Sequence, residues 1–216
     1  MTPFPVILSS PSGGGKTTIA RALLTRRRDV GYSVSCTTRE PRKGEVDGVD
    51  YFFLTPDEFE SAAARGDFAE WAEVHGQRYG TLKREVERVL SGGKHVIMDI
   101  DVQGARQLAE VFPASVLIFL VPPSAEVLLE RLRGRRSEGP EALVRRLKTA
   151  VEELKAVSMY HYMVTNDRLD VAIARVSSII DAEAARSERR REEHDADVST
   201  LIMQLQLEIR KQQELG

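Results

Sequence analysis

The sequence predicts an α/β fold in which a parallel sheet is covered by helices on both faces. Five short runs are almost continuously apolar and rich in β-branched residues, which is typical of strands buried on both faces. Longer segments of helical periodicity alternate with these runs, and this alternation indicates parallel strands joined by helices. The length of 216 residues exceeds one ordinary domain and falls short of two, so we expect one domain with a sizeable insertion.

These two patterns assign the main elements in chain order. The strands are expected at residues 4–9, 32–36, 94–100, 116–121 and 162–165. The helices are expected at residues 17–27, 81–90, 103–112, 125–133, 141–157 and 169–190. The assignments predict a five-stranded parallel sheet between two helical layers.

Residues 37–80 interrupt the alternation. They contain a charged loop, a short aromatic strand at 51–54 and an alternating run at 68–75. Between these two strands, Thr55 followed by Glu58 forms the signature of a capping box that opens a helix. We therefore expect a small, partly antiparallel subdomain inserted into a core made of residues 1–36 and 81–186.

Two further segments stand outside this pattern. Residues 134–140 join two helices through Gly, Ser and charged side chains, which favours a surface flap. The tail, residues 187–216, has a charge run followed by apolar residues at helical spacing, which predicts an amphipathic helix. Such a helix could pack on its own domain, pair with another subunit to form a homo-oligomer, or extend into solvent.

Charge and cysteine content exclude several classes of protein. Thirty-one Lys and Arg against 33 Asp and Glu leave a formal charge of −2, so no global field attracts nucleic acid or an anionic membrane surface. Any bound anion must be held by a local cluster. The single cysteine, Cys36, excludes an intramolecular disulfide, and no apolar run approaches the ~20 residues of a membrane span. We expect a cytoplasmic protein with neither nucleic-acid nor membrane partners.

A phosphate-binding loop follows the first predicted strand. Residues 10–17 read Ser-Pro-Ser-Gly-Gly-Gly-Lys-Thr and match G-x-x-x-x-G-K-[ST], except that Ser10 replaces the first glycine. In such a loop the backbone N–H groups surround a β-phosphate, while a side chain like that of Lys16 reaches the β- and γ-phosphates. The Thr17 hydroxyl is placed to bind Mg²⁺. Strand, loop and helix occur in the required order, which predicts a nucleoside triphosphate site.

The loop by itself is compatible with a GTPase switch, a motor or transport ATPase, or a small-molecule kinase. The N-K-x-D motif that reads guanine in GTPases is absent from the sequence. A kinase needs a second anion site for its acceptor, and Arg39 and Arg42 follow the end of a predicted strand, three residues apart. Arginine side chains bind phosphate bidentately, so these two favour a kinase.

Five ordered blocks of sequence resemble the guanylate kinase family. They are the S-x-T-T-R-x-P-R-x-G-E string at 35–45, Gly-Val-Asp-Tyr-Phe-Phe at 48–53, Phe-Ala-Glu-Trp at 68–71, Tyr-Gly-Thr at 79–81 and Asp-Ile-Asp-Val-Gln-Gly at 99–104. The resemblance extends over residues 4–186 and leaves out the tail. It implies a three-layer P-loop kinase with a GMP-binding α+β insert and a lid at about 131–146, which transfers a phosphoryl group from MgATP to GMP.

The resemblance also implies roles for individual residues. The expected catalytic residues are Lys16, Arg39, Arg131, Arg135 and Arg146. ATP is expected to contact Ser12, Gly13, Gly14, Gly15, Lys16, Thr17, Thr18 and Asn166. GMP is expected to contact Ser35, Arg39, Arg42, Tyr51, Glu70, Tyr79, Thr81 and Asp101. Thr17 and Asp99 are the expected residues near Mg²⁺.

Two alternatives stand beside this interpretation. A non-catalytic module of the same fold would bind a protein segment in the GMP cleft, although the intact Gly15, Lys16 and Thr17 argue against it. A kinase of another nucleoside monophosphate would share the loop and the arginines. Glu70 and Thr81 distinguish that case, because a carboxylate accepts hydrogen bonds from both guanine N1–H and the 2-amino group.

Overall fold

Five parallel strands form the central sheet, in the order β2-β7-β1-β8-β9. The structure is a computed structural model that describes residues 2–74, 76–133, 140–189 and 191–214. The strands are β1 (Pro5–Ser9), β2 (Val30–Tyr32), β7 (His95–Met98), β8 (Val116–Val121) and β9 (Tyr162–Thr165). The predicted five-stranded parallel sheet is thus confirmed, and β1 lies at its centre, so that the phosphate loop emerges from the middle of the carboxyl edge.

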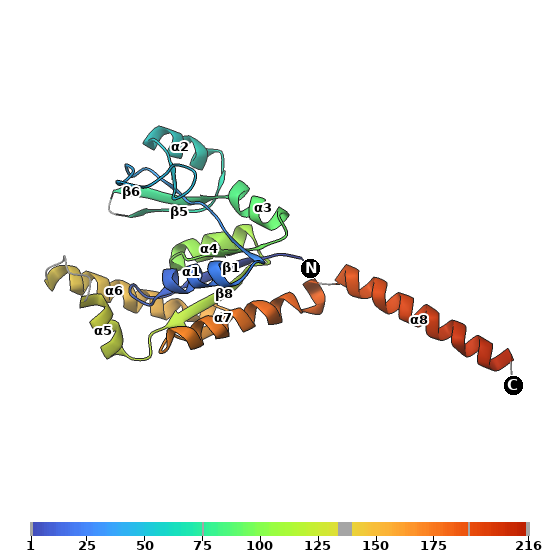
Figure 1. The fold of residues 1–216 in the computed structure, drawn as a ribbon. Coiled ribbons are helices and arrows are strands. Elements are labelled where there is room, and N and C mark those ends of the chain that lie inside the picture. Colours follow the sequence, from blue (N-terminus) through green and yellow to red (C-terminus); the bar gives the residue numbers. More distant parts are fainter. Residues whose placement is uncertain (1, 75, 134–139, 190, 215–216) are drawn as a thin grey trace.

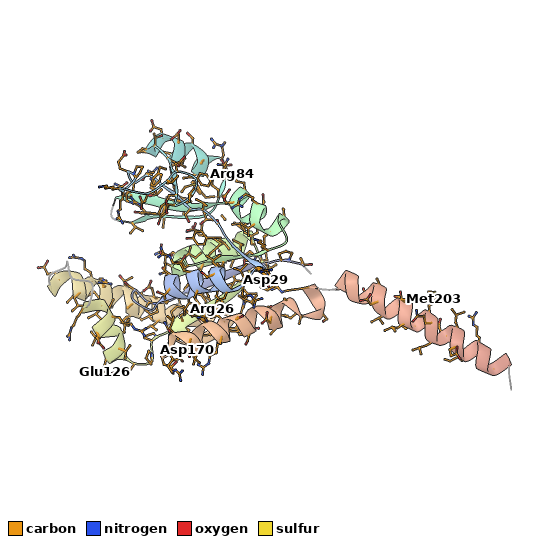
Figure 2. The ribbon with its side chains drawn as sticks, viewed as in Figure 1. Arg26, Asp29, Arg84, Glu126, Asp170 and Met203 are labelled. Carbon is orange, nitrogen blue, oxygen red and sulfur yellow. The ribbon has the colours of Figure 1, made fainter. Side chains whose placement is uncertain are left out.

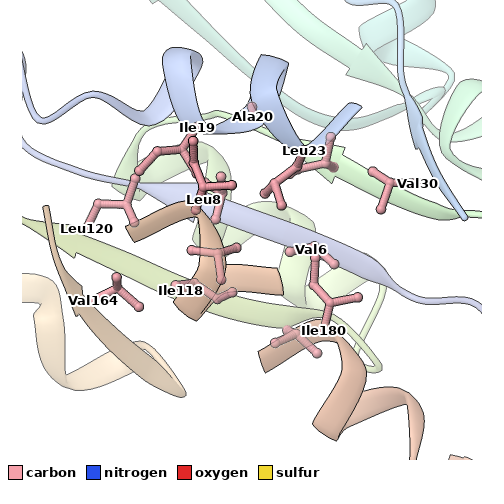
Figure 3. Close-up of a cluster of buried hydrophobic side chains, with 14 of the residues drawn as sticks. Val6, Leu8, Ile19, Ala20, Leu23, Val30, Ile118, Leu120, Val164 and Ile180 are labelled. Atoms are coloured by element: carbon pink, nitrogen blue, oxygen red, sulfur yellow. The ribbon is translucent and has the colours of Figure 1, made fainter. Parts of the chain in front are cut away.

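Helices cover both faces of this sheet (Figure 1). On one face, α1 (Lys16–Arg26) and α7 (Leu169–Ala184) pack against alternate residues of β1 and β8, including Val6, Leu8 and Ile118 (Figure 3). On the other face, α3 (Lys83–Ser91) and α4 (Val102–Val111) pack against the intervening residue Ile7 and its neighbours. Successive side chains of a strand point to opposite faces of the sheet, so the buried residues of each strand contribute to two separate apolar layers.

The insert has a second sheet of four strands, in the order β4-β3-β6-β5. The strands are β3 (Cys36–Thr37), β4 (Phe52–Phe53), β5 (Phe68–Val74) and β6 (Gln77–Leu82), and the sheet is mixed because β3 and β4 are parallel while the other pairs are antiparallel. Helix α2 (Pro56–Ala64) begins with the predicted capping box: the Thr55 hydroxyl accepts from the Glu58 N–H, and the Glu58 carboxylate accepts from the Thr55 N–H. Phe59 of α2 is fully buried against this sheet.

Three predicted boundaries are wrong. The strand expected at 32–36 is two strands in different sheets, because β2 ends at Tyr32 and β3 begins at Cys36. The helix expected at 81–90 begins at Lys83, since Thr81 still pairs with β5. The helix expected at 169–190 ends at Ala184 and is followed by a 3₁₀ turn at Ser187–Arg189; no Gly or Pro marks that break in the sequence.

A helical pair follows β8. Helices α5 (Ala125–Arg133) and α6 (Pro140–Lys155) pack through Leu128, Leu132 and Ala150, and a 3₁₀ helix, η1 (Ala156–Met159), leads into β9. Residues 134–139 of the predicted flap lie outside the described residues. The two helices bring arginine side chains toward the phosphate loop, as detailed below.

The tail forms one helix, α8 (Arg191–Glu214), which extends away from all other elements (Figure 1). Its side chains are exposed throughout residues 195–210, and Figure 2 shows Met203 far from the rest of the protein. The predicted helix is confirmed, but it does not pack on its own domain. Within the described ranges, no helix has the length and apolar character needed to span a membrane.

Truncation of a buried side chain in β8, next to the central strand, should be costly. Ile118 is fully buried between β1 and the α1 and α7 layer, so Ile118→Ala should lower the free energy of unfolding by about 2 to 5 kcal/mol. Met163 on the adjacent strand is 65% exposed, and Met163→Ala should change stability by less than about 0.5 kcal/mol. Urea unfolding followed by circular dichroism measures both, and equal losses would contradict this account of the core.

Candidate active site

The phosphate loop lies between β1 and α1, and its glycines allow close packing. A side chain on Gly14 would lie 2.5 Å from Ser10 Cβ and 2.9 Å from the Pro11 carbonyl oxygen, so only glycine fits there. Gly15 has φ +91° and is the N-cap of α1, without a side-chain cap. The first N–H groups of α1 therefore remain available to an anion.

Ser10, which departs from the motif, fits into the first turn of the loop. Its side chain is buried, and its hydroxyl donates to the Pro11 carbonyl oxygen at 3.0 Å. Gly14 N–H donates to the same carbonyl oxygen at 2.8 Å. The serine thus satisfies its own hydrogen-bonding group within the turn.

Thr17 and Asp99 meet at the carboxyl edge of the sheet. The Thr17 hydroxyl donates to Asp99 Oδ2 at 2.5 Å. A hydroxyl and a carboxylate are oxygen ligands of the kind that Mg²⁺ prefers. Asp101 has a different position: it is the N-cap of α4, and its Oδ1 accepts from the Gly104 N–H at 2.8 Å.

A cleft of 660 Å³ opens between the parallel sheet and the insert. It is lined by every residue predicted to contact GMP and by both residues predicted to lie near Mg²⁺. These residues come from α1, β5, β6 and the loops that precede β3, follow β3 and follow β7, so distant parts of the sequence meet in one place. The cleft residues are Thr17, Ser35, Arg39, Arg42, Tyr51, Glu70, Tyr79, Thr81, Asp99 and Asp101.

At one end of the cleft, Arg39 is held by a carboxylate. Its two terminal nitrogens donate to Glu45 at 3.0 and 2.9 Å, and its guanidinium lies 5.5 Å from the centre of the Tyr51 ring. Glu45 also accepts from the Arg42 N–H at 2.7 Å. The Arg39 guanidinium and this N–H lower the pKa of the Glu45 carboxyl. Glu45 is the last residue of the string at 35–45 that resembles the family, but the sequence did not predict that it pairs with Arg39.

At the other end, Glu70 is a buried carboxylate, only 8% exposed. Its Oε1 accepts from the Thr81 hydroxyl at 2.6 Å. Burial raises the pKa of Glu70 to about 7, and the Thr81 hydrogen bond offsets only part of this rise. Nearby Asp101 adds to the rise because its negative charge disfavours a second one.

A β-bulge determines the direction of Glu70. Between Phe68 and Glu70, the register of β5 against β6 shifts by one residue. As a result Phe68 and Trp71 both contact the ring of Phe59, at centroid distances of 4.4 and 6.0 Å, while Glu70 faces the cleft. Strict alternation along the strand would not place Phe68 and Trp71 on the same side.

Two of the predicted lid arginines contact the phosphate-loop region. Arg131 donates to the Asn166 carbonyl oxygen at 3.1 Å, and its other terminal nitrogen is buried with no hydrogen-bond partner among the described residues. Arg146 donates to the Ser12 hydroxyl at 3.1 Å and to the Leu132 carbonyl oxygen. The predicted residue Arg135 lies outside the described residues.

Asn166 supports the loop from behind. Its buried amide nitrogen donates to the Gly14 carbonyl oxygen at 2.9 Å, and a side chain on Gly15 would collide with it at 2.5 Å. The N-cap of α7 is Arg168, so Asn166 does not cap that helix. The remaining predicted residues, Gly13, Lys16 and Thr18, lie in the loop or the first turn of α1.

Glu153 of α6 is a loop contact that sequence reasoning missed. Its carboxylate accepts from the Ser12 N–H at 3.2 Å. Burial raises its pKa, while the nearby Lys16 ammonium lowers it. The helical pattern of residues 141–157 contained no signal for this contact, because Glu153 comes from a charged helix face and only the fold brings it to the loop.

The arrangement is suited to joining two anionic ligands. The loop and the helix N-terminus provide one anion site, the arginine pair provides another, and the Thr17 and Asp99 pair lies at the edge of the cleft between the two. A buried carboxylate at the far end can accept hydrogen bonds from a ligand that presents adjacent donors. This geometry favours a phosphoryl transfer whose acceptor carries both a phosphate and a hydrogen-bonding base.

Comparisons with known proteins agree with this geometry. Residues 2–183 match the protein-family model described as guanylate kinase. A guanylate kinase of Clostridium perfringens (strain SM101) is 48% identical over 187 residues, covering 87% of each chain, and that of Symbiobacterium thermophilum is 47% identical, covering 85% of this chain and 87% of the other. The crystal structure of guanylate kinase from Anaplasma phagocytophilum has a TM-score of 0.69 and 34% identity, covering 87% of this chain and 89% of that one.

The buried carboxyl of Glu70 should make stability depend on pH. Its ordinary pKa is 4.5 and its pKa in the folded protein is about 7, so the native state holds an extra proton between these values. The free energy of unfolding should therefore fall by about 3 kcal/mol as the pH rises from 4.5 to above 7. Glu70→Gln has no such group, so the difference in stability between the two proteins should change by this amount.

Urea titrations at intervals between pH 4.5 and 8 measure this difference. The comparison cancels the titration of all other groups that the two proteins share. Parallel pH profiles would mean that the carboxyl of Glu70 titrates normally.

Proposed function

This chain belongs to the guanylate kinase family, and we propose how its residues carry out the family's reaction. It phosphorylates GMP with ATP as the donor, giving GDP and ADP. The close bacterial relatives do not favour the non-catalytic alternative. The observation that carries the assignment is that arginines and a buried carboxylate occupy opposite ends of one cleft, beside the phosphate loop.

The phosphate of GMP binds at the arginine end in this proposal. Arg39 and Arg42 provide positive charge, and the Tyr51 and Tyr79 hydroxyls add hydrogen-bond donors. Glu45 keeps the Arg39 guanidinium oriented before GMP arrives. Because the phosphate has a second pKa of ~6, it is mostly a dianion at neutral pH and needs no general base to act as the nucleophile.

The guanine base binds at the Glu70 end. A carboxylate accepts from guanine N1–H and from the 2-amino group, whereas adenine has an acceptor at N1 and no 2-amino group. Glu70 is buried, so an adenine in the same place would leave its oxygens without partners. Thr81 already donates to one of these oxygens, and Ser35 and Asp101 line the cleft beside it.

ATP binds at the loop, with Gly13 to Gly15 around its phosphates and Lys16 along the β- and γ-phosphates. Thr17 and Asp99 fit Mg²⁺ by the chemistry of their oxygen atoms and would hold it, directly or through water. When bound, the ion would supply positive charge that offsets the negative charge of the phosphates. Asn166 stabilises the loop by donating a hydrogen bond to the Gly14 carbonyl oxygen, and Thr18 lies in the first turn of α1.

Arg131 and Arg146 are proposed to stabilise the charge that develops on the transferred phosphoryl group. The buried terminal nitrogen of Arg131 supports this role, because a donor without a partner among the described residues can serve an anion. Arg135 is included in this set by resemblance only. A cytoplasmic location is part of the same proposal, since a free buried Cys36 suits a reducing compartment.

Base selection should depend on Glu70. Glu70→Gln replaces one acceptor by a donor, so one guanine contact becomes donor against donor in a buried place. An unpaired buried group costs about 1 to 3 kcal/mol, so kcat/KM for GMP should fall roughly tenfold to hundredfold, and the preference for GMP over AMP should narrow. The KM for ATP should not change.

ADP formation measured with GMP, AMP, CMP, UMP and dTMP tests the proposal directly. Wild-type protein should prefer GMP, and Lys16→Met should remove turnover while GMP binding by calorimetry persists. A preference for another monophosphate in the wild-type protein, or the same preference in Glu70→Gln, would contradict the assignment of the base site.

We further propose that the tail pairs with the tail of a second copy of this chain. Exposed apolar side chains recur at alternate spacings of four and three along α8, at Val198, Ile202, Leu205 and Ile209. This is a heptad pattern with Ile202 and Ile209 at a and Val198 and Leu205 at d, and β-branched residues at a with leucine at d favour a parallel two-stranded coiled coil. Most of the stability of helices in proteins comes from packing of an apolar face, and pairing would supply this packing to α8.

The base of the tail is attached to the core. Arg189 donates to Glu183 at 3.2 Å, and its guanidinium lies 4.1 Å from the centre of the Phe4 ring. Glu183, only 3% exposed, also accepts from the Tyr162 hydroxyl. The last of these contacts is at Arg189, two residues before α8, and the apolar stripe of α8 stays open to a partner.

Sedimentation velocity distinguishes pairing from a solvent-exposed helix. Wild-type protein should be dimeric, and Ile202→Asp at an a position should make it monomeric, with kcat unchanged because no assigned site residue lies in α8. Leu207→Asp is the matched control, since Leu207 is equally exposed but lies at the outer f position. A monomeric wild-type protein at micromolar concentration, or a dimer in Ile202→Asp, would contradict the proposal.

A further inference from the structure

Gly104 in the first turn of α4 lies directly against the carboxylate of Glu70. A Cβ at Gly104 would be 2.9 Å from Glu70 Oε2, 3.4 Å from its Cδ and 3.5 Å from Asp101 Oδ1. The backbone gives no reason for glycine here, because Gly104 is a buried helical residue without a positive φ. Glycine within a helix costs about 1 kcal/mol relative to alanine. The remaining reason is space: any side chain would displace the carboxylate.

Gln107, one turn later, holds the neighbouring backbone. Its Oε1 accepts from the Trp71 N–H, and its Nε2 donates to the Trp71 carbonyl oxygen, both at 3.1 Å. Strand β5 is an edge strand, so these two backbone groups have no strand partner on that side. The side-chain amide pairs with the edge as a further strand would, and it does so at the residue that directly follows Glu70.

A third contact connects the same two elements. Ala69, on the other side of Glu70 in sequence, is buried in the apolar cluster that contains Ala105 and Leu108 of α4. Glu70 is therefore flanked by residues that contact α4, while its own carboxylate rests on Gly104. Because residues three apart lie on one helix face, Gly104 and Gln107 act on Glu70 and Trp71 from the same side.

We propose that Gly104 and Gln107 are positioning residues for recognition of the base: they set where the Glu70 carboxylate stands in the cleft. This inference rests on the proposed role of Glu70 as the guanine reader. It gives residues within helix α4 a share in base selection, in addition to the N-cap Asp101 that lines the cleft. The N-cap of α4 is Asp101, two residues after Asp99, so the base reader is placed relative to the same strand end that carries the proposed Mg²⁺ residue.

Gly104→Ala separates positioning from stability. Alanine in a helix should keep or raise the melting temperature, because it is the better helix former. The added methyl group should nevertheless push the carboxylate away from its place beside Thr81. We expect kcat/KM for GMP to fall about tenfold, the preference for GMP over AMP to narrow, and the KM for ATP to stay constant.

Gln107→Ala tests the backbone contact independently. It should weaken GMP binding measured by calorimetry without ATP, and it should narrow the same base preference by a smaller factor than Gly104→Ala. Gln107→Glu keeps an acceptor for the Trp71 N–H but loses the donor to the Trp71 carbonyl oxygen and places a carboxylate oxygen against it. Its effect on the base preference should therefore be at least as large as that of Gln107→Ala. Gln103→Ala is the matched control, because Gln103 lies on the exposed face of the same helix.

Glu70→Gln, measured in parallel, distinguishes a failure of the positioning inference from a failure of the proposed role of Glu70. If Glu70→Gln narrows the base preference while Gly104→Ala and Gln107→Ala leave it as in wild type, the positioning inference is wrong and the base reader stands. If Glu70→Gln leaves the preference unchanged, the proposed function of Glu70 is wrong. A loss of melting temperature in Gln107→Ala with an unchanged preference would show a structural role only.

Discussion

The pairing of β1 with β7 is the constraint on which the site depends. The two strands are parallel, with Ile7 opposite Met98, so they end at the same edge of the sheet. The loop that follows β1 and the carboxylate of Asp99 that follows β7 are therefore neighbours, and the Thr17 hydroxyl donates to Asp99. The position of the phosphate loop, the contact between Thr17 and Asp99 and the start of α4 all follow from this one ladder of backbone hydrogen bonds, which is buried between two apolar layers.

The two ends of the cleft each contain a carboxyl, and the pKa values of these two carboxyls are shifted in opposite directions. Near the insert loop, Glu45 is kept ionised by Arg39, so the charge of that pair persists over the whole neutral range. Near α4, burial moves the pKa of Glu70 up to about 7, so the folded protein holds this carboxylate at a cost in stability. A ligand with two adjacent donors offsets that cost, whereas one without them does not. In the proposed function, base selection and the loss of stability at this position both result from the burial of Glu70.

The insert is coupled to the core through a few directed contacts. Side-chain hydrogen bonds from Gln107 close the edge of β5, and Ala69 reaches into the apolar layer under α4. The bulge in β5 then separates the aromatic side from the cleft side of the same strand. A polar side chain can be buried this close to an apolar cluster because Thr81 satisfies one of its oxygens and Gly104 leaves room for the other.

The sequence by itself determined the parallel α/β architecture, the phosphate loop and the capped helix of the insert. Each of these is encoded locally, by hydrophobic period, by glycine and lysine at fixed spacing, or by Thr55 and Glu58 three residues apart. The string around Arg39 and the other family blocks were enough to predict which residues line the cleft. Tertiary structure alone decided where the run at 32–36 divides between two sheets, which way Glu70 points and which partners hold it. Glu45, Gly104, Gln107 and Glu153 act through contacts that only the folded chain creates, so no local pattern could identify them.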